Sequence, residues 1–452
     1  MRMASDMRKE MWQIALPITA QSLFQASMSV IDQIMTGQLG AVSVAGIGIA
    51  GKFSSLYSVI AAAVAAAAGI LIAQFIGNRD WDGVSRYFWL SLCTVAGLAV
   101  LFTVIGAGGA ETVMKIYSED PDTVRAAAVY LRILSIGFVP MALTTILTTV
   151  HRGVGYAKVP LYAGIVSVCV NTGLNYLLIF GKCGFPEMGI AGAAWATTIA
   201  RLTELLLVIG FTGYLQQGGN IKIKIISPAQ MESRDFRLYL TVLGPIFLCE
   251  ALWSLGENVY AVIYGRMGTD PCAAMTLTGP VQNLMIGAMT GMASAAGIMI
   301  GKKLGKGKEE EAYREGKLFM WYGFLGTAVF SVILLLLRGS YVRLFDVEPA
   351  VKEMTVQILT AYAIVVIVKV ENMILGGGII RSGGKTKLIL MIDAIGTWCV
   401  GIPLGLLSAF VWELPIAWTY LILSQEECVR FLISLVVFRK KIWMQNLTKE
   451  NA

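Results

Sequence analysis

The sequence predicts an all-α polytopic membrane protein with twelve transmembrane helices. Hydrophobic residues make up 56% of its 452 residues, charged residues make up only 14%, and the mean hydropathy is +0.69. A soluble globular domain carries about 25% charged residues. A helix of about twenty apolar residues spans a bilayer. Such segments lie near 12–37, 44–76, 87–109, 124–149, 159–181, 189–215, 236–264, 271–301, 316–337, 351–380, 386–410 and 414–438.

Lysine and arginine are divided unequally between the loops on the two sides of these segments. The side that holds both chain ends carries 24 of them, and the opposite side carries seven. Because basic loops stay on the cytoplasmic side, we expect both termini to be cytoplasmic. An even number of spans agrees with this orientation.

The second half of the sequence repeats the first. Pro17, Gly37, Gly40, Gly51 and Gly77 recur, all at one constant spacing, as Pro245, Gly265, Gly268, Gly279 and Gly305. The motif RGVGYAK (152–158) faces RSGGKTK (381–387) with the spacing shifted by one residue. We therefore predict two parallel six-helix lobes, residues 1–215 and 238–452, joined by a cytoplasmic linker at 216–237. Parallel repeats with a substrate site between them are typical of secondary transporters.

A polar stripe with a carboxylate runs through the first segment. Gln21, Gln25, Ser29, Asp32 and Thr36 recur at steps of three and four residues, which place side chains on one face of a helix. An ionisable residue at membrane depth indicates a functional site. The alternative for Asp32 is a structural carboxylate bound to a neighbouring helix.

The seventh segment carries a second stripe with its acids at other depths. Its Glu250, Glu257 and Tyr260 fall in the register of Ser22, Ser29 and Asp32. Two glutamates seven residues apart lie roughly 10 Å apart along a helix, which suits an elongated acidic lining for a cation better than a compact metal site. The alternative is that each glutamate pairs with a buried base.

Further polar side chains occur inside the predicted spans. Arg201 and Glu204 are three residues apart on one helix and are predicted to form an ion pair. Asp393 could line a cavity or brace it.

The only histidine, His151, lies at a helix end, so a proton relay would depend on carboxylates. No motif for ATP hydrolysis or protease chemistry is present in a suitable context, and we expect a protein that is not an enzyme.

Several motifs, in this order and spacing, resemble the multidrug and toxic compound extrusion (MATE) family, and its bacterial, NorM-like members in particular. They are IDQIMTGQLG (31–40), LIAQFIGNRD (71–80), VNTGLNYLLIFG (170–181), GIAGAAWATTIAR (189–201), ENMILGGGIIRSGGKTK (371–387) and MIDAIGTWCVGIPLG (391–405). The resemblance implies two six-helix lobes that form a V around a central cavity. It also implies efflux of organic, often cationic, compounds in exchange for Na+ or H+, and a place in the bacterial inner (cytoplasmic) membrane.

The resemblance also assigns residues. Asp32 matches the first-helix aspartate that the family uses for ion coupling, and Asn171, Asn175 and Thr197 match neighbouring positions. Glu250 matches an acidic position on the seventh helix. Asparagine and threonine oxygens can coordinate a monovalent cation, but interhelical hydrogen bonds are their commoner use in membranes. Archaeal members carry a second aspartate where this chain has Asn175, which weakens a mechanism based on a pair of carboxylates.

The resulting hypothesis is an antiporter that works by alternating access. Ion coupling is assigned to Asp32, Asn171, Asn175 and Thr197, and a substrate cavity or second ion site to Gln25, Ser29, Glu250, Glu257, Tyr260 and Asp393. We expect small organic cations as substrates, contact with lipids, a monomer, no nucleic acid, no cofactor and no metal other than Na+. The alternative is a lipid-linked oligosaccharide flippase. Eight acids against five bases at membrane depth favour cations over that anionic cargo.

Overall fold

The computed structural model describes residues 2–226, 231–345 and 347–449, without the side chains of 2–6, 28–30 and 41. Within these ranges the regular structure is helical, and eleven spans are long and apolar enough to cross a membrane. They coincide with the first eleven predicted segments. The twelfth, 414–438, consists of α15 (Ile416–Leu423) and α16 (Gln425–Arg439), which are separated at Ser424, so neither piece alone has spanning length.

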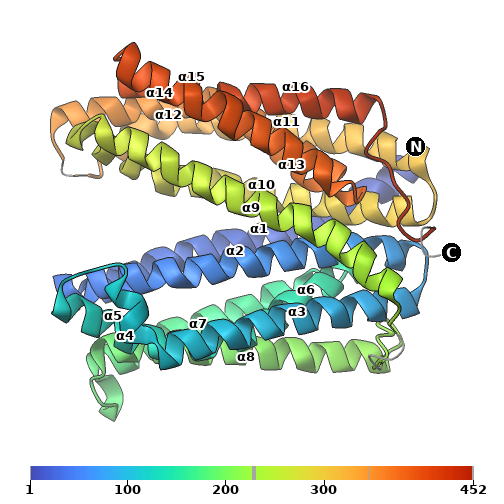
Figure 1. The fold of residues 1–452 in the computed structure, drawn as a ribbon, viewed down its shortest axis with the longest axis horizontal. Helices are drawn as coiled ribbons and strands as arrows, with labels where there is room; N and C mark the ends of the chain where they lie inside the picture. The colour runs from blue at the N-terminus through green and yellow to red at the C-terminus, as the bar shows by residue number, and fades with distance from the viewer. Residues whose placement is uncertain (1, 227–230, 346, 450–452) are drawn as a thin grey trace. The chain divides into compact units, whose positions relative to one another are not determined.

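The first half of the chain forms the elements α1 (Arg2–Gly37), α2 (Ala41–Gly77), α3 (Trp81–Gly108), α4 (Ala110–Lys115), α5 (Pro121–Leu134), η1 (Ser135–Gly137), α6 (Phe138–Val154), α7 (Lys158–Phe180), η2 (Lys182–Gly184) and α8 (Gly189–Gln217). Carboxylate caps begin two of these helices: Asp80 accepts from the amide of Gly83 at 2.8 Å, and Asp120 accepts from that of Thr123 at 3.0 Å. Such caps satisfy amides that the first helical turn leaves free. Figure 1 shows the long helices of this half running side by side.

The second half forms α9 (Ser233–Arg266), α10 (Thr269–Gly305), α11 (Glu309–Val342), α12 (Pro349–Asn372), η4 (Met373–Ile380), α13 (Thr386–Ala394), η5 (Ile395–Gly401), α14 (Ile402–Leu406), η6 (Leu407–Val411), α15 and α16. Wide π-helical turns interrupt the α-helices at η4, η5 and η6. The first of them allows close packing, because a Cβ on Gly378 would lie 2.6 Å from the carbonyl oxygen of Ala293 on α10.

The internal repeat is visible in the second helix of each half. Both α2 and α10 contain 37 residues, and they start and end at positions related by the constant spacing of the repeat. Gly40 and Gly268 precede them with φ angles of +86° and +129°, a region that glycine alone enters readily. The repeated glycines therefore preserve the same turn before equivalent helices.

Contacts divide the chain into two compact units. The amino-terminal unit comprises Ala20–Tyr239, and the carboxyl-terminal unit comprises Met1–Thr19 and Leu240–Ala452. The sequence predicted lobes at 1–215 and 238–452. It therefore assigned residues 1–19 to the amino-terminal lobe, whereas the contacts group them with the carboxyl-terminal unit. Those residues pack within the carboxyl-terminal unit: Thr19 donates to the carbonyl of Ala288 at 3.0 Å, and a Cβ on Gly291 would lie 2.2 Å from the carbonyl oxygen of Ala15.

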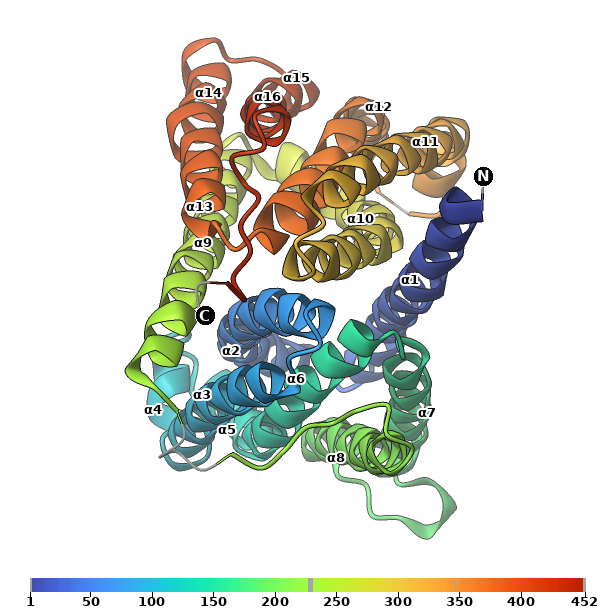
Figure 2. The same ribbon diagram turned by 90° about the vertical axis from the view of Figure 1, so that its right-hand side faces the viewer.

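The described part of the predicted linker belongs to the amino-terminal unit because hydrogen bonds and an ion pair join it to α3. The indole of Trp89 donates to the carbonyl of Lys224 at 2.9 Å, and the Lys224 amide donates to the Ser85 hydroxyl at 3.0 Å. Further along, Asp235 forms an ion pair with Arg86 at 3.2 Å. The end-on view in Figure 2 shows the connection after α8 crossing the end of this bundle.

Apolar side chains cover the outside of the spans as well as the core. Most of the apolar part of α11 is not buried, and its Trp321, Val329 and Leu336 are all more than half exposed. In water such a surface would aggregate, whereas in a bilayer it faces lipid. The outer face of α11 is therefore suited to contact with lipid.

Candidate functional site

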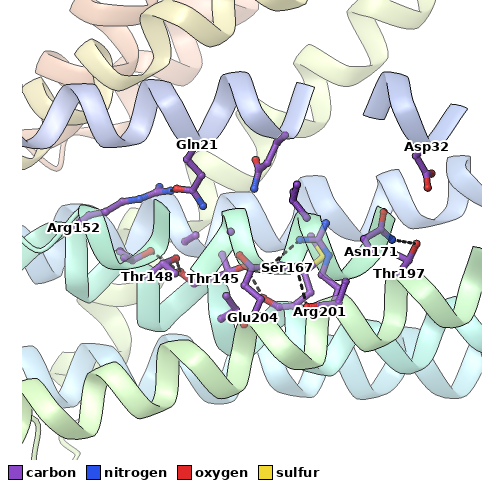
Figure 3. A pocket seen from close by; sticks show the side chains of 18 residues that line it. Gln21, Asp32, Thr145, Thr148, Arg152, Ser167, Asn171, Thr197, Arg201 and Glu204 are labelled. Carbon is purple, nitrogen blue, oxygen red and sulfur yellow. Dashed lines mark hydrogen bonds and ion pairs between the residues drawn. The ribbon is translucent and has the colours of Figure 1, made fainter. Parts of the chain in front are cut away.

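The amino-terminal unit contains a partly open cavity of about 470 Å³, which is lined by both polar and apolar side chains. Its walls come from α1, α2, α6, α7 and α8, and they include Gln21, Gln25 and Asp32 of the predicted stripe. Figure 3 shows Asp32, Asn171 and Thr197 at one end, Ser167, Arg201 and Glu204 in the middle, and Gln21 and Arg152 at the other end. Side chains of this kind can form hydrogen bonds with a polar guest, whereas lipid cannot.

The four residues assigned to ion coupling come together at the Asp32 end. Asn175 donates to the carboxylate of Asp32 at 2.5 Å and to the amide oxygen of Asn171 at 3.4 Å. Asn171 donates to the hydroxyl of Thr197 at 3.3 Å. The hydroxyl of Thr36 donates to the backbone carbonyl of Asp32 at 2.8 Å, so this member of the stripe supports the helix rather than the cavity.

The carboxylate of Asp32 has no basic partner. Within the described residues no lysine or arginine lies within ion-pair distance of it, and its side chain is half-buried. The amide oxygen of Asn175 is buried without a hydrogen-bond donor. A carboxylate, amide oxygens and a hydroxyl form a donor set that can hold a proton or a hard monovalent cation. The buried Tyr130, whose hydroxyl interacts with Thr197, borders this set and was not found from the sequence.

The middle of the cavity holds the predicted ion pair. Arg201 contacts Glu204 at 3.3 Å, and both lie on α8. The three-residue step along one helix was the signal that predicted it. The pair leaves this part of the lining with almost no net charge.

The far end of the cavity holds Arg152, the first residue of the motif RGVGYAK, which was given no functional role from the sequence. Its guanidinium donates to the amide oxygen of Gln21 at 2.8 Å. The signal that could have identified it is the match between RGVGYAK and RSGGKTK, which gives Arg152 an equivalent in Arg381 of the second half.

The carboxyl-terminal unit holds a connected set of ion pairs. Arg430 contacts Asp393 at 3.8 Å, Glu426 at 3.6 Å and Glu427 at 3.9 Å, and Lys369 contacts Glu427 at 4.0 Å. Glu426 and Glu427 lie four and three residues before Arg430, spacings at which side chains on one helix can pair. The set lines cavities of about 220 Å³ and 60 Å³.

The residues predicted for a second site do not converge on one place. Glu250 forms an ion pair with Arg381 at 3.1 Å, which is the alternative that the sequence left open. Glu257 is exposed and lines the smaller cavity with Tyr260, whose hydroxyl donates to Glu426 at 2.6 Å. Asp393 lines the larger one and accepts from the Cys249 thiol at 2.8 Å.

Two further predicted residues lie on α1. Gln25 lines the amino-terminal cavity, whereas the side chain of Ser29 lies outside the described residues. Glu371, in contrast, is 5% exposed, and one of its carboxylate oxygens is buried without a hydrogen-bond partner. A Cβ on Gly323 of α11 would lie 2.9 Å from that oxygen, so Glu371 faces α11 rather than a cavity.

The comparisons with known proteins agree with the internal repeat of the chain. The MatE family model matches residues 17–177 and again residues 245–407, so the two matches begin at Pro17 and Pro245, the first pair of the internal repeat. The chain belongs to this family of membrane transporters, and it is not an enzyme.

Relatives of the chain are known from sequence and from structure. It is 24% identical over 396 residues to a probable multidrug resistance protein NorM of Streptococcus pneumoniae, covering 87% of this chain and 86% of the relative. It is also 24% identical over 401 residues to the multidrug resistance protein MdtK of Yersinia pseudotuberculosis, covering 87% and 86%. A mutant of the Vibrio cholerae MATE transporter VcmN has the same fold, with a TM-score of 0.89, 17% identity and 98% coverage of both chains.

Proposed function

We propose that this protein is a secondary active antiporter of the bacterial inner membrane, with both termini in the cytoplasm. It exports small organic cations in exchange for Na+ or H+. One observation supports the proposal above the others: Asp32 is a half-buried carboxylate in a polar cavity, and its side-chain partner is the neutral Asn175. Relatives named for multidrug resistance support the substrate class.

The mechanism follows from competition for one carboxylate. A cationic substrate and the coupling ion both gain by neutralising Asp32, so the binding of one weakens the binding of the other. This effect is reciprocal by thermodynamic linkage. If the cavity opens alternately to the two sides of the membrane, an inward ion gradient then expels the substrate. Asn171, Asn175 and Thr197 supply oxygens to a desolvated Na+, which makes Na+ the coupling ion we favour.

The test measures transport of a fluorescent organic cation in proteoliposomes, with a Na+ gradient and a pH gradient imposed separately. We expect Asp32→Asn to lower ion-driven transport at least about tenfold, because the amide cannot hold the ion against the substrate. Asp122→Asn, which removes an exposed acid on α5, serves as the control. Undiminished transport by a folded Asp32→Asn protein would refute the assignment.

The flippase alternative makes a different demand on the same cavity. A pyrophosphate-linked cargo needs a predominantly cationic lining, whereas Asp32 and Glu204 match Arg152 and Arg201 in number here. The names of the relatives add no support for it. We also propose that the protein acts as a monomer, because each unit contains its own polar cavities.

A further inference from the structure

The two halves of the chain place an arginine at equivalent positions but give it different partners. Arg152 and Arg381 are the first residues of the matching motifs RGVGYAK and RSGGKTK. Arg381 contacts Glu250 at 3.1 Å, and Arg152 contacts Gln21 at 2.8 Å. Both contacts join residues 131 positions apart in the chain. Gln21 in the first half is therefore the counterpart of Glu250 in the second half.

This exchange leaves Arg152 with a positive charge that no partner neutralises. Within the described residues no carboxylate lies within 4.0 Å of its guanidinium, and its Nε is buried without a hydrogen-bond acceptor. Glu204 attracts it from a greater distance but is already paired with Arg201 at 3.3 Å. Burying an uncompensated charge is costly, so the structure retains an arginine that is ready to receive an anion.

The surroundings of Arg152 are suited to a carboxylate. Arg152 lines the 470 Å³ cavity together with Thr144 and Thr148, and the Thr148 hydroxyl already donates to the carbonyl of Thr145 at 3.0 Å. The Thr144 hydroxyl is buried without a partner. A guanidinium binds a carboxylate through two parallel hydrogen bonds, and a neighbouring hydroxyl can donate a third.

The opposite end of the same cavity carries the opposite charge. Figure 3 shows Arg152 and Asp32 at its two ends. Gln21, the partner of Arg152, and Asp32 are eleven residues apart on α1, which corresponds to roughly 16 Å along a helix axis. A guest with a cationic group at one end and an anionic group at the other would therefore satisfy both charges.

We propose that Arg152 forms an anion-binding subsite that holds the carboxylate of an amphoteric substrate, whose cationic group lies toward Asp32. This inference rests on the proposed export function for its biological role, and it specifies the substrate class. Compounds that carry a carboxylate as well as an amine would then bind more tightly than their esters.

The test uses two forms of one dye with the purified full-length protein. A rhodamine with a free carboxylate is compared with its methyl ester, which keeps the cation and removes the anion, and binding is measured by fluorescence anisotropy. We expect Arg152→Gln to weaken binding of the acid about tenfold, as for the loss of one charge-assisted hydrogen-bonded contact. Binding of the ester should change less than about twofold. Arg152→Lys keeps the charge but cannot form the two parallel hydrogen bonds, so it should retain only part of the affinity for the acid.

Two further variants keep the test decisive. Arg132→Gln removes an exposed arginine outside the cavity and should change neither dye. If Arg152→Gln does not fold, Gln21→Glu leaves the arginine in place and neutralises it, with the same expected loss for the acid alone. Equal losses for acid and ester, or no loss for either, would overturn the subsite.

Transport of the same dyes separates this inference from the proposed function. If the wild-type protein binds the acid through Arg152 but moves neither dye under a Na+ or pH gradient, the export function fails and the subsite stands. If both dyes are exported at rates that Arg152→Gln does not alter and the binding ratio is unchanged, the subsite fails and the export function stands.

Discussion

The two units of the protein are built from the same repeat but use their charged residues differently. In the carboxyl-terminal unit Glu250, Asp393, Glu426 and Glu427 each contact a base. In the amino-terminal unit the charges of Asp32 and Arg152 face amide partners, Asn175 and Gln21. An ion pair braces helices against each other, whereas a charge with a neutral partner remains able to bind a guest. The comparison supports the proposal that the first unit binds the substrate, whereas much of the charge of the second unit is used in ion pairs.

The largest expected effect is on the stability of the carboxyl-terminal network. Arg430 is one-tenth exposed and contacts three acids. Arg430→Met should lower the free energy of unfolding by about 3–5 kcal/mol, because it removes the counter-charge that Asp393, Glu426 and Glu427 share. The measurement is an unfolding titration of the purified protein in detergent.

Arg201 is the matched position in the amino-terminal unit, because the spacing that relates Arg152 to Arg381 also relates Arg201 to Arg430. Its side chain is 39% exposed and contacts one acid. Arg201→Met should cost about 1–2 kcal/mol. Equal losses from the two substitutions would contradict the contrast between a bracing network and an open cavity.

A smaller effect is expected from the single ion pair of Glu250. Glu250→Gln removes the counter-charge of Arg381, whose side chain is 18% exposed, and should cost about 2 kcal/mol. Gln21→Ala removes the neutral partner of Arg152 and should cost about 1 kcal/mol. The same unfolding titration compares them, and a larger loss from Gln21→Ala would reverse the roles we give to the two arginines.

An effect of similar size is expected where a glycine lets the ion-pair network pack closely. A Cβ on Gly401 would lie 2.2 Å from the Tyr260 hydroxyl and 2.6 Å from a Glu426 oxygen. Gly401→Ala should therefore cost about 1–2 kcal/mol through overpacking, seen as a lower midpoint of thermal unfolding. Gly173 of α7 has open space around it. Gly173→Ala should raise that midpoint slightly, because alanine gains up to about 1 kcal/mol over glycine in a helix; a fall at both positions would point to helix geometry instead.

Much of the amino-terminal site was predictable because its signals are local. The steps of three and four residues placed Gln21, Gln25 and Asp32 on one face of α1, and all three line the cavity. The residues Asn171, Asn175 and Thr197 were assigned by resemblance, and the structure groups them at Asp32. Arg152 was missed because it stands at a helix end, where a basic residue normally indicates only orientation.

The second site was harder to predict because its partners are far apart in the chain. Glu250 and Glu257 share a helical stripe, yet Glu250 pairs with Arg381 and Glu257 is exposed. The register based on the repeated prolines and glycines set Glu250 opposite Ser22, whereas the contacts make Gln21 its counterpart. A shift of one residue turns a side chain by about 100° around a helix, which decides which partner it meets.

The sequence by itself determined the class of protein, eleven of the spans and the repeat, and it predicts their orientation. Hydropathy, loop charge and glycine spacing are properties of short segments, and a bilayer constrains them strongly. Only the tertiary structure decided which charges are neutralised, which cavities they line and where the units divide. These outcomes depend on how helices that lie far apart in the chain pack together. A local sequence pattern does not predict that packing. For this reason the sequence predicted Asp32 as a site residue. The unpaired charge of Arg152 could be identified only from the structure, which shows Gln21 as its partner.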